Sequence, residues 1–439
     1  MRRLLGCLLL AVTMFVPGAP GPGFAQGLVN SETFSGFQFN FNNPGARALG
    51  MGGAFVAVAD DATAVVANPA GLVILQRPEI SAEVKFTKFR NTINAFSNTP
   101  AEGATNSVRS RTFEDDVVTP SFFSYVYPAE SLVVAAFIRE LVNYESTFET
   151  QGVFFTDPST GLVERLFPVR SKLDLQALNF GLGAAVNLEK HHPLLPNIGA
   201  SLEFSFGRIR SRLERFDTLG PDGPPDFSAP IQTESVDGTD LGIGFNVGAL
   251  WRPVKNLAIG AVYRRGPRYE VTFETVSPGF FDSVVTTTPI SLKVPDVVAA
   301  GVSYRFFERL TIAFEATHIS YSQLVDDFQA TIGNVDRRRY RLDDAVELHL
   351  GAEYIFFIKE MPLAARVGFY TNPDHKIRYV GTAANADEAA EKLLYRAGKD
   401  RYHVTGGLGI VPFPGVQLDF AGNYSKELQE FSISTVFRF

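Results

Sequence analysis

The sequence predicts an all-β fold over residues 78–439: a transmembrane antiparallel β-barrel of about fourteen strands. Half-apolar segments recur throughout this range, and most reach the ~9–11 residues that a tilted strand needs to cross a bilayer. The connections between them alternate between long and short, as in barrels with tight turns on one side and long loops on the other. Within the segments, apolar and polar residues alternate, so that one face can meet lipid and the other a polar lumen.

The last segment shows this alternation clearly, because Phe431, Ile433 and Phe437 are separated by Ser432 and Ser434. A soluble β-sandwich or solenoid would also have short alternating strands, but it would not explain the alternating lengths of the connections. We expect strands at residues 78–90, 119–127, 131–142, 172–189, 197–215, 238–252, 256–274, 295–306, 309–319, 345–357, 362–370, 400–412, 415–425 and 430–439.

Residues 1–25 have the features of a secretory signal peptide: an Arg2-Arg3 start, an apolar run and a small-residue cleavage site. Cleavage would remove the only cysteine, Cys7, which excludes disulfides, iron–sulfur clusters and thiol catalysis. None of the six histidines stands in a recognisable catalytic triad. We therefore expect no enzyme, no cofactor and no metal site. The net charge of −7 argues against nucleic acid as a partner.

Residues 26–77 do not alternate, and they are rich in small residues. A barrel of about fourteen strands has a lumen too wide for side chains alone to fill, so we expect this segment to plug it. The expected domains are a signal peptide (1–25), an N-terminal hatch or plug (26–77) and a transmembrane β-barrel (78–439). A phosphate-binding loop is a poor alternative, because no Gly-Lys-Ser/Thr follows the glycines. The residues assigned to the hatch are Arg47, Gly50, Gly52, Gly53, Asp60, Asp61, Asn68, Pro69 and Ala70.

The run from Ala46 to Gly71, with Asn68-Pro69-Ala70, resembles the hatch of the FadL family (FadL/TodX-like) of outer-membrane transporters for long-chain fatty acids and other hydrophobic compounds. Val294-Pro295-Asp296 and residues 366–370 are similar to later strands of that family. The resemblance implies passive uptake in the outer membrane of a Gram-negative bacterium, through a lumenal apolar pocket, hatch movement and a lateral exit. The family's exit lies in the third strand, here near residues 131–142, a stretch without Gly or Pro.

Candidate ligand contacts are Val133, Ala135 and Phe137, because this stretch is apolar on both faces. The alternation of side chains along each strand also places charged residues inside the barrel, where an Arg could bind a fatty-acid carboxylate. Arg305 and Arg366 are the candidates. The alternative is an ion-pair network that stiffens the barrel or latches the hatch, with Arg47 as the partner of the acids. The charged residues concerned are Glu203, Arg305, Glu315, Glu347, Glu353, Arg366 and Asp419.

The expected partners are hydrophobic small molecules (fatty acids or aromatic hydrocarbons), lipopolysaccharide and outer-membrane lipids, and we expect a monomer. The basic run Arg337–Arg341 could bind lipopolysaccharide phosphates, or it could be a solvated run balanced by nearby aspartates. Residues 386–397 are typical of an amphipathic helix that either forms part of a ligand groove or covers loop backbone. An alternative function is that of an outer-membrane partner in protein secretion or surface attachment. A diffusion porin would need no hatch.

Overall fold

The computed structural model describes residues 41–96, 109–190, 192, 194–219, 224–278, 283–326 and 339–439. The expected signal peptide, residues 26–40 of the expected hatch, and Arg337 and Arg338 lie outside this part of the chain.

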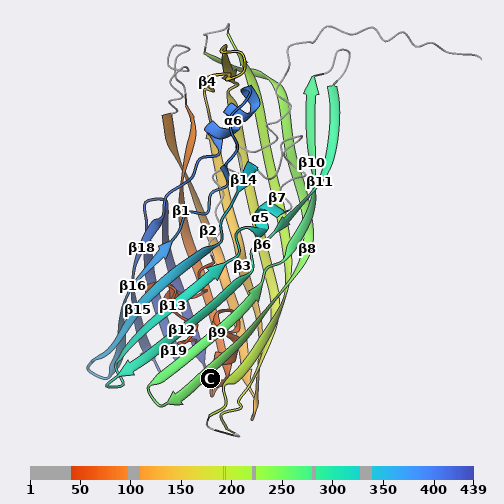
Figure 1. The fold of residues 1–439 in the computed structure, drawn as a ribbon. Helices are drawn as coiled ribbons and strands as arrows, with labels where there is room; N and C mark the ends of the chain where they lie inside the picture. The colour runs from red at the N-terminus through yellow and green to blue at the C-terminus, as the bar shows by residue number, and fades with distance from the viewer. Residues whose placement is uncertain are drawn as a thin grey trace, which may run out of the picture.

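Fourteen antiparallel strands form a closed barrel (Figure 1), which confirms the predicted fold class. The ring closes where β1 pairs with β20 and where β8 pairs with β9. Each predicted segment overlaps one barrel strand, in the predicted order, and the segment 256–274 overlaps a second strand as well. These strands are β1 (Glu79–Phe96), β2 (Arg109–Pro128), β3 (Leu132–Glu149), β6 (Val169–Val186), β7 (Asn197–Thr218), β8 (Pro225–Val254), β9 (Leu257–Arg265), β12 (Val297–Phe306), β13 (Leu310–Ile319), β15 (Ala345–Ile358), β16 (Met361–Asn372), β18 (Arg401–Phe413), β19 (Val416–Tyr424) and β20 (Leu428–Arg438).

Much of what the sequence analysis assigned to long loops is strand. β8 alone has 30 residues, roughly 100 Å at ~3.3 Å per residue, against a hydrocarbon core of ~30 Å. The expected strand 256–274 is wrong, because Gly266-Pro267 separates β9 from β10 (Arg268–Pro278), which pairs with β11 (Ser283–Lys293) and β8. Apolar alternation marks only the part of a strand that meets lipid. The backbone ladder needs no apolar face, so it continues beyond the bilayer.

Lipid-facing and lumen-facing residues alternate as predicted. On β6, Leu178, Phe180 and Leu182 point outwards and are exposed, whereas Asn179 between them is fully buried. The remaining elements are the helices α2 (Ala46–Gly50), α3 (Ala64–Ala67), η1 (Pro69–Ile74), α5 (Gln323–Asp326) and α6 (Ala386–Leu394), and the short strands β4 (Val153–Thr156), β5 (Val163–Leu166), β14 (Tyr340–Arg341) and β17 (Arg378–Tyr379). Among the described residues, no helix is long and apolar enough to cross a bilayer.

The expected amphipathic helix is α6, which lies at the end of the barrel opposite the C-terminus (Figure 1). Its N-terminus is capped by Asn385, whose side chain accepts a hydrogen bond from the Glu388 nitrogen at 2.9 Å. Arg339 forms an ion pair with Glu388, and Arg341 donates to Asp343 at 2.6 Å. The described part of the basic run is therefore balanced by carboxylates, the second of the two expected readings. Hydrogen bonds from Arg378 and Arg341 lower the pKa of the Asp343 carboxyl.

Candidate functional site

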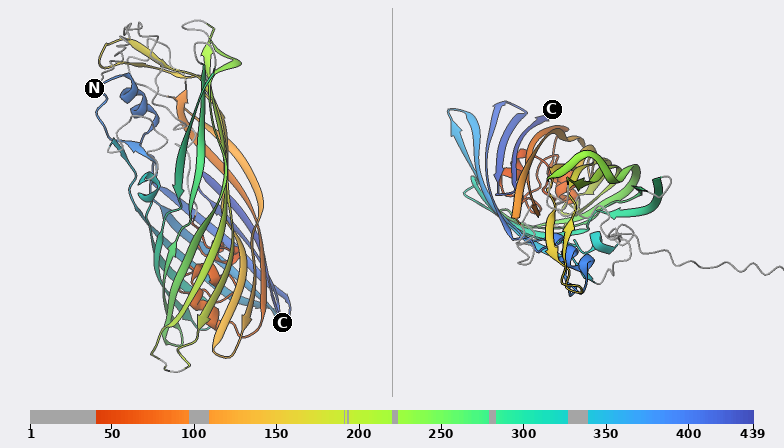
Figure 2. Two further views of the ribbon diagram at one scale, coloured as in Figure 1. Left: turned by 90° about the vertical axis from the view of Figure 1, so that its right-hand side faces the viewer. Right: turned by 90° about the horizontal axis from the view of Figure 1, so that it is seen from above.

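Residues 44–77 lie inside the barrel, towards the end with the short turns (Figure 2). Helix α2 contacts β16, β18, β19 and β20, whereas η1 contacts β3, β6, β7 and β8, on the other side of the ring. A segment that touches opposite walls must lie between them. Val56, Val65 and Leu72 are accordingly fully buried. This part of the chain is called the lumenal segment below.

Glycines in the wall make room for the backbone of the lumenal segment. A Cβ added at Gly368 would meet the Gly52 nitrogen, and one at Gly351 would meet the Met51 oxygen, each at under 3.0 Å. The segment contributes glycines too: Gly52 and Gly53 have φ of +66° and +77°, a conformation that other residues adopt only with strain. Backbone of the segment also lies against the wall glycines Gly199 and Gly260, and side chains of the segment lie against Gly183 and Gly248.

Changing Gly368 to alanine is expected to displace the lumenal segment, because its new Cβ would overlap with backbone rather than with a movable side chain. Gly406, on the neighbouring strand, offers a matched control, since an added Cβ there would meet only the Arg366 oxygen at 3.8 Å. Thermal unfolding in detergent should show a lower midpoint for Gly368→Ala and an unchanged one for Gly406→Ala. Equal midpoints for the two variants would contradict this tight packing.

Asn68 ties the lumenal segment to the wall. Its side-chain nitrogen donates to the Val56 oxygen at 2.9 Å and to the Ala249 oxygen of β8 at 3.0 Å. Its side-chain oxygen accepts from the Ala70 nitrogen at 3.2 Å, which caps η1, and Pro69 occupies the first turn. The Asn-Pro-Ala run therefore satisfies both a helix end and a wall carbonyl.

A buried ion-pair network anchors α2. Arg47 donates to both oxygens of Glu353 at 2.9 Å, and it also pairs with Asp60 and, at 3.5 Å, with Asp61. Glu353 in turn accepts from Arg366 Nε at 2.7 Å, and the other side of that guanidinium donates to Asp419 at 2.6 Å. The Arg366 side chain is only 2% exposed. With two carboxylates bound to it, Arg366 fits the expected network better than the role of a ligand-binding residue.

The same network continues along the wall and returns to the lumenal segment at Ala62. Gln417 donates to Asp419 at 2.8 Å and accepts from Arg438 at 3.1 Å. Arg438 also donates to Glu79 at 2.7 Å, and Glu79 accepts from the backbone nitrogen of Ala62, in the lumenal segment, at 2.7 Å. This network thus joins wall and segment at two places, Arg47–Glu353 and Ala62–Glu79, by charged hydrogen bonds, which are stronger than neutral ones.

Arg305, the other candidate for ligand binding, belongs to the edge of this network. Its guanidinium lies 3.6 Å from Asp60, and its side chain is 48% exposed. Neither Arg305 nor Arg366 lines the cavity described next.

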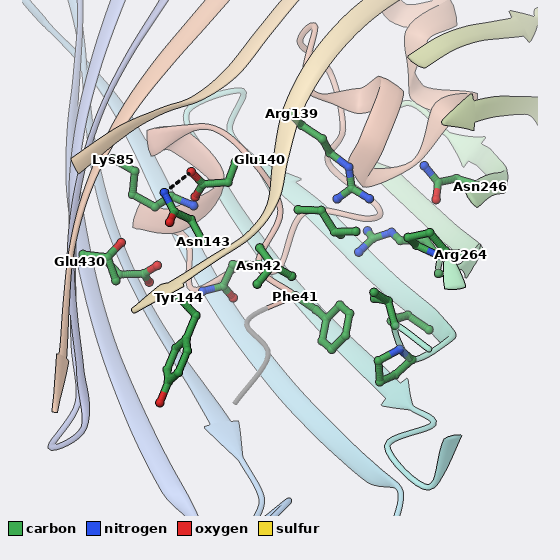
Figure 3. A pocket seen from close by; sticks show the side chains of 18 of the residues that line it. Phe41, Asn42, Lys85, Arg139, Glu140, Asn143, Tyr144, Asn246, Arg264 and Glu430 are labelled. Carbon is green, nitrogen blue, oxygen red and sulfur yellow. Dashed lines mark hydrogen bonds between the residues drawn. The ribbon is translucent and has the colours of Figure 1, made fainter. Parts of the chain in front are cut away.

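A cavity lies in the lumen beside Phe41 and Asn42, where the lumenal segment begins (Figure 3). Its lining mixes aromatic, apolar and charged side chains, so it is not the uniformly apolar pocket that the resemblance implies. β3 contributes residues 139–144. The other side chains that matter here are Lys85, Phe89, Asn246, Arg264, Val294 and Glu430.

The cations of this cavity differ in their partners. Arg139 donates twice to Glu203, at 3.0 and 2.9 Å, and Lys85 lies near Glu140 (Figure 3). Arg264 donates from Nη2 to the side-chain oxygen of Asn43 at 2.6 Å and to the Ala67 oxygen at 2.8 Å, and its Nε is buried without a hydrogen-bond partner. Within the described residues it forms no ion pair. A buried donor of this kind is costly unless something accepts from it.

The wall beside the cavity lacks part of its backbone ladder. β2 and β3 pair only from Phe122–Arg139 down to Pro128–Val133. Above Phe122 the described part of β2 pairs with β1 alone, and above Arg139 β3 pairs with β6 alone. The two strands meet again higher up, where the Thr147 nitrogen donates to Asp115 at 3.3 Å. We call the interval between these two contacts the β2–β3 window.

A β-bulge lies at each edge of the window, one in β2 and one in β3. The β1–β2 register skips Ser121, and the β3–β6 register skips Leu141; an extra residue of this kind bends its strand. Pro120, beside the first bulge, has no N–H to donate to a neighbouring strand. Residues 131–142 of the third strand contain no Gly or Pro, whereas the second strand contains Pro120, a local signal that the prediction of the exit did not use.

The candidate contacts Val133, Ala135 and Phe137 lie below the window and point into the lumen, where they pack against Val65 and Leu72 of the lumenal segment. They face the segment rather than the cavity. The sequence analysis did not single out Arg139 or Arg264. Arg264 stood inside a strand predicted as continuous through residue 274, although the Gly266-Pro267 that follows could have indicated a strand end.

Comparisons with known proteins agree with this architecture. A family model described as outer membrane protein transport protein (OMPP1/FadL/TodX) matches residues 28–378. Similar solved structures include a FadL homologue of Pseudomonas aeruginosa (TM-score 0.62, 14% identity, 92% of this chain and 100% of that chain covered) and the toluene transporter TbuX of Ralstonia pickettii (TM-score 0.56, 16% identity, 91% and 99% covered). A third is the monoaromatic hydrocarbon channel CymD (TM-score 0.56, 14% identity, 92% and 99% covered).

At such identities the structural likeness shows the fold alone. No curated protein matches the sequence. The family model, however, spans most of the chain. The protein therefore belongs to the OMPP1/FadL/TodX family of outer-membrane transport proteins, as the resemblance of its N-terminal run predicted, and it is a transport protein rather than an enzyme.

Proposed function

We propose that this protein takes up hydrophobic molecules that carry an anionic head group, long-chain fatty acids above all, and releases them sideways through the β2–β3 window. The observation that carries the proposal is that the missing ladder lies beside the cavity, because Arg139–Tyr144 of β3 border both. In this proposal the lumenal segment is a hatch that closes the way to the periplasm, and the protein works as a monomer.

A lateral route suits an apolar ligand. Each CH₂ group gains about 0.8 kcal/mol on leaving water, so a long alkyl chain would cross an aqueous pore only against a large free-energy cost. Passage from a lumenal cavity into the bilayer through the wall avoids water at every step. The family's solved relatives include proteins named for toluene and for monoaromatic hydrocarbons, so neutral aromatic ligands are the alternative class.

Arg264 favours the anionic class. It lines the cavity, forms no ion pair with a described residue, and keeps a buried Nε donor without a partner. A carboxylate could accept from that nitrogen in a charge-assisted hydrogen bond, whereas a hydrocarbon could not. Phe89 and Val294 provide apolar surface for the chain of the same ligand.

The test measures binding and uptake of a long-chain fatty acid and of toluene by the purified protein in proteoliposomes. Arg264→Gln is expected to weaken fatty-acid binding by about 10- to 100-fold, as loss of a charged hydrogen bond of ~1.5–3 kcal/mol requires. Toluene uptake should not change. Arg268→Gln, which removes a cation from β10 outside the cavity lining, serves as the matched control.

Three results would contradict the proposal. If wild-type protein moved neither ligand, the proposal that it takes up hydrophobic molecules would be wrong. If it moved toluene but bound no fatty acid, or if Arg264→Gln bound the fatty acid as tightly as wild type, the anionic class would be wrong. A difference in gel mobility between heated and unheated samples of each variant would show that the variant still forms a barrel.

A further inference from the structure

The outward face of β6, β7 and β8 has a sharp upper boundary to its apolar belt. These strands are neighbours in the wall (Figure 1), and Leu178, Phe206 and Leu241 lie side by side in register. They are 40%, 55% and 51% exposed, respectively. Below this row the outward residues of β7 are apolar, namely Ile198, Ala200, Leu202 and Phe204.

Directly above that boundary, β7 presents an arginine at three successive outward positions, Arg208, Arg210 and Arg212. Successive outward positions on a strand are about 6.6 Å apart, so the column extends over roughly 13 Å. The barrel's C-terminus and short turns lie at the other end (Figure 1), so this column stands at the outer interface of the membrane. The three cross-strand rows are Gln176–Arg208–Thr239, Asp174–Arg210–Asp237 and Lys172–Arg212–Ser235.

The charges differ from row to row. In the second row Arg210 stands between two carboxylates, Asp174 and Asp237, so the first and third rows are those that can attract an anion. In the first row Arg208 has only neutral hydrogen-bonding neighbours, and it forms no ion pair with any residue that the structure describes. In the third row Lys172 stands directly opposite Arg212, and like charges in that position repel. Both side chains are 63% exposed. An anion placed between these two cations would relieve that repulsion.

The carboxylates nearby do not saturate the column. Arg210 lies 3.3 Å from Asp237, Arg212 lies 2.7 Å from Glu214, and Lys172 lies 3.3 Å from Glu145. Ion pairs that are open to solvent on at least one side are weak, because water and salt screen them. A phosphate, which a guanidinium can bind with two parallel hydrogen bonds, would compete successfully for the same side chains.

We propose that this column, Arg208–Arg210–Arg212 with Lys172, binds phosphate groups of lipopolysaccharide in the outer leaflet. The lipid's acyl chains would lie along the apolar belt below Phe206, and its phosphates would lie at the level of the arginines. The position of the column, immediately outside the belt and not on a distant loop, favours a membrane lipid over a soluble anion. The basic run at Arg337–Arg341 is not needed for this site.

The test compares the triple variant Arg208→Gln, Arg210→Gln, Arg212→Gln with a control that removes three exposed cations at the short turns: Lys255→Gln, Arg309→Gln and Lys359→Gln. Purified lipopolysaccharide, phosphatidylglycerol and inorganic phosphate are titrated separately against each protein in mild detergent, with native mass spectrometry as the readout. The triple variant is expected to lose at least about tenfold in lipopolysaccharide affinity, since each charged hydrogen bond contributes ~1.5–3 kcal/mol. The control should bind as wild type does.

Equal lipopolysaccharide binding by the triple variant and wild type would overturn the proposal. So would binding of inorganic phosphate or phosphatidylglycerol as tight as that of lipopolysaccharide, or a protein partner that masks the column in wild-type outer membranes. Because these side chains point outwards, the triple variant should keep the heat-dependent gel shift of a folded barrel and the uptake of ligand. A negative result for the lipopolysaccharide site would therefore leave the proposed transport function untouched.

Discussion

Replacing Arg47 with methionine is expected to loosen the lumenal segment and to raise the ion conductance of the protein in planar bilayers several-fold. The change leaves Asp60, Asp61 and Glu353 facing one another without the cation that they share. Removing one partner of a buried ion pair costs about 3–5 kcal/mol, and Arg47 is the one charged residue of α2. Limited proteolysis should then cut within residues 44–77 of the variant, whereas the same residues of the wild type should stay intact.

The network also predicts graded effects. Glu353→Gln should act more weakly than Arg47→Met, because Arg47 would keep Asp60 and Asp61 while Arg366 would keep Asp419. Arg305→Met is the matched control, since that arginine is half exposed and only approaches Asp60 at 3.6 Å. Its conductance should equal that of wild type. A closed, protease-resistant Arg47→Met protein would show that the ion pairs do not hold the segment.

The sequence predicted the barrel well because side-chain alternation is a local property. Parity alone placed Glu203, Glu315 and Glu353 in the lumen, and all three are buried there. What these carboxylates bind could not be predicted in the same way. Glu315, for example, accepts hydrogen bonds from the backbone nitrogens of Phe55 and Val56, so its partner depends on how a remote segment threads through the ring.

The cavity and the window were harder to predict for a related reason. The side chain of Arg264 is placed in the cavity by its hydrogen bonds to Asn43 and Ala67, which are more than a hundred residues away in the chain. A bulge adds one residue without changing composition, so Leu141 looks like any other apolar residue of its strand. Only Pro120 gave a local signal, because a proline inside a strand indicates an edge or a bulge.

Deletion of Leu141 is expected to close the β2–β3 window and to reduce uptake of hydrophobic ligand by roughly an order of magnitude or more. The register explains why the strand should tolerate it: Glu140 pairs with Leu178 and Val142 with Ala177. Without Leu141 those two pairs become consecutive, so every later residue of β3 keeps its partner on β6. The strand loses the bend that the bulge imposes and can run beside β2. An alkyl chain must then leave through water, at about 0.8 kcal/mol per CH₂.

Leu141→Ala separates geometry from side-chain chemistry. It shortens an apolar residue of the cavity lining but keeps the extra backbone unit, so the bend and the window should remain. Uptake by proteoliposomes should therefore fall strongly for the deletion and little for the substitution, while ligand binding inside the cavity persists in both. If the deletion variant transported as fast as wild type, the ligand would not leave through this part of the wall. A passage past the lumenal segment into the periplasm would then be the remaining route, and Arg47→Met should speed it.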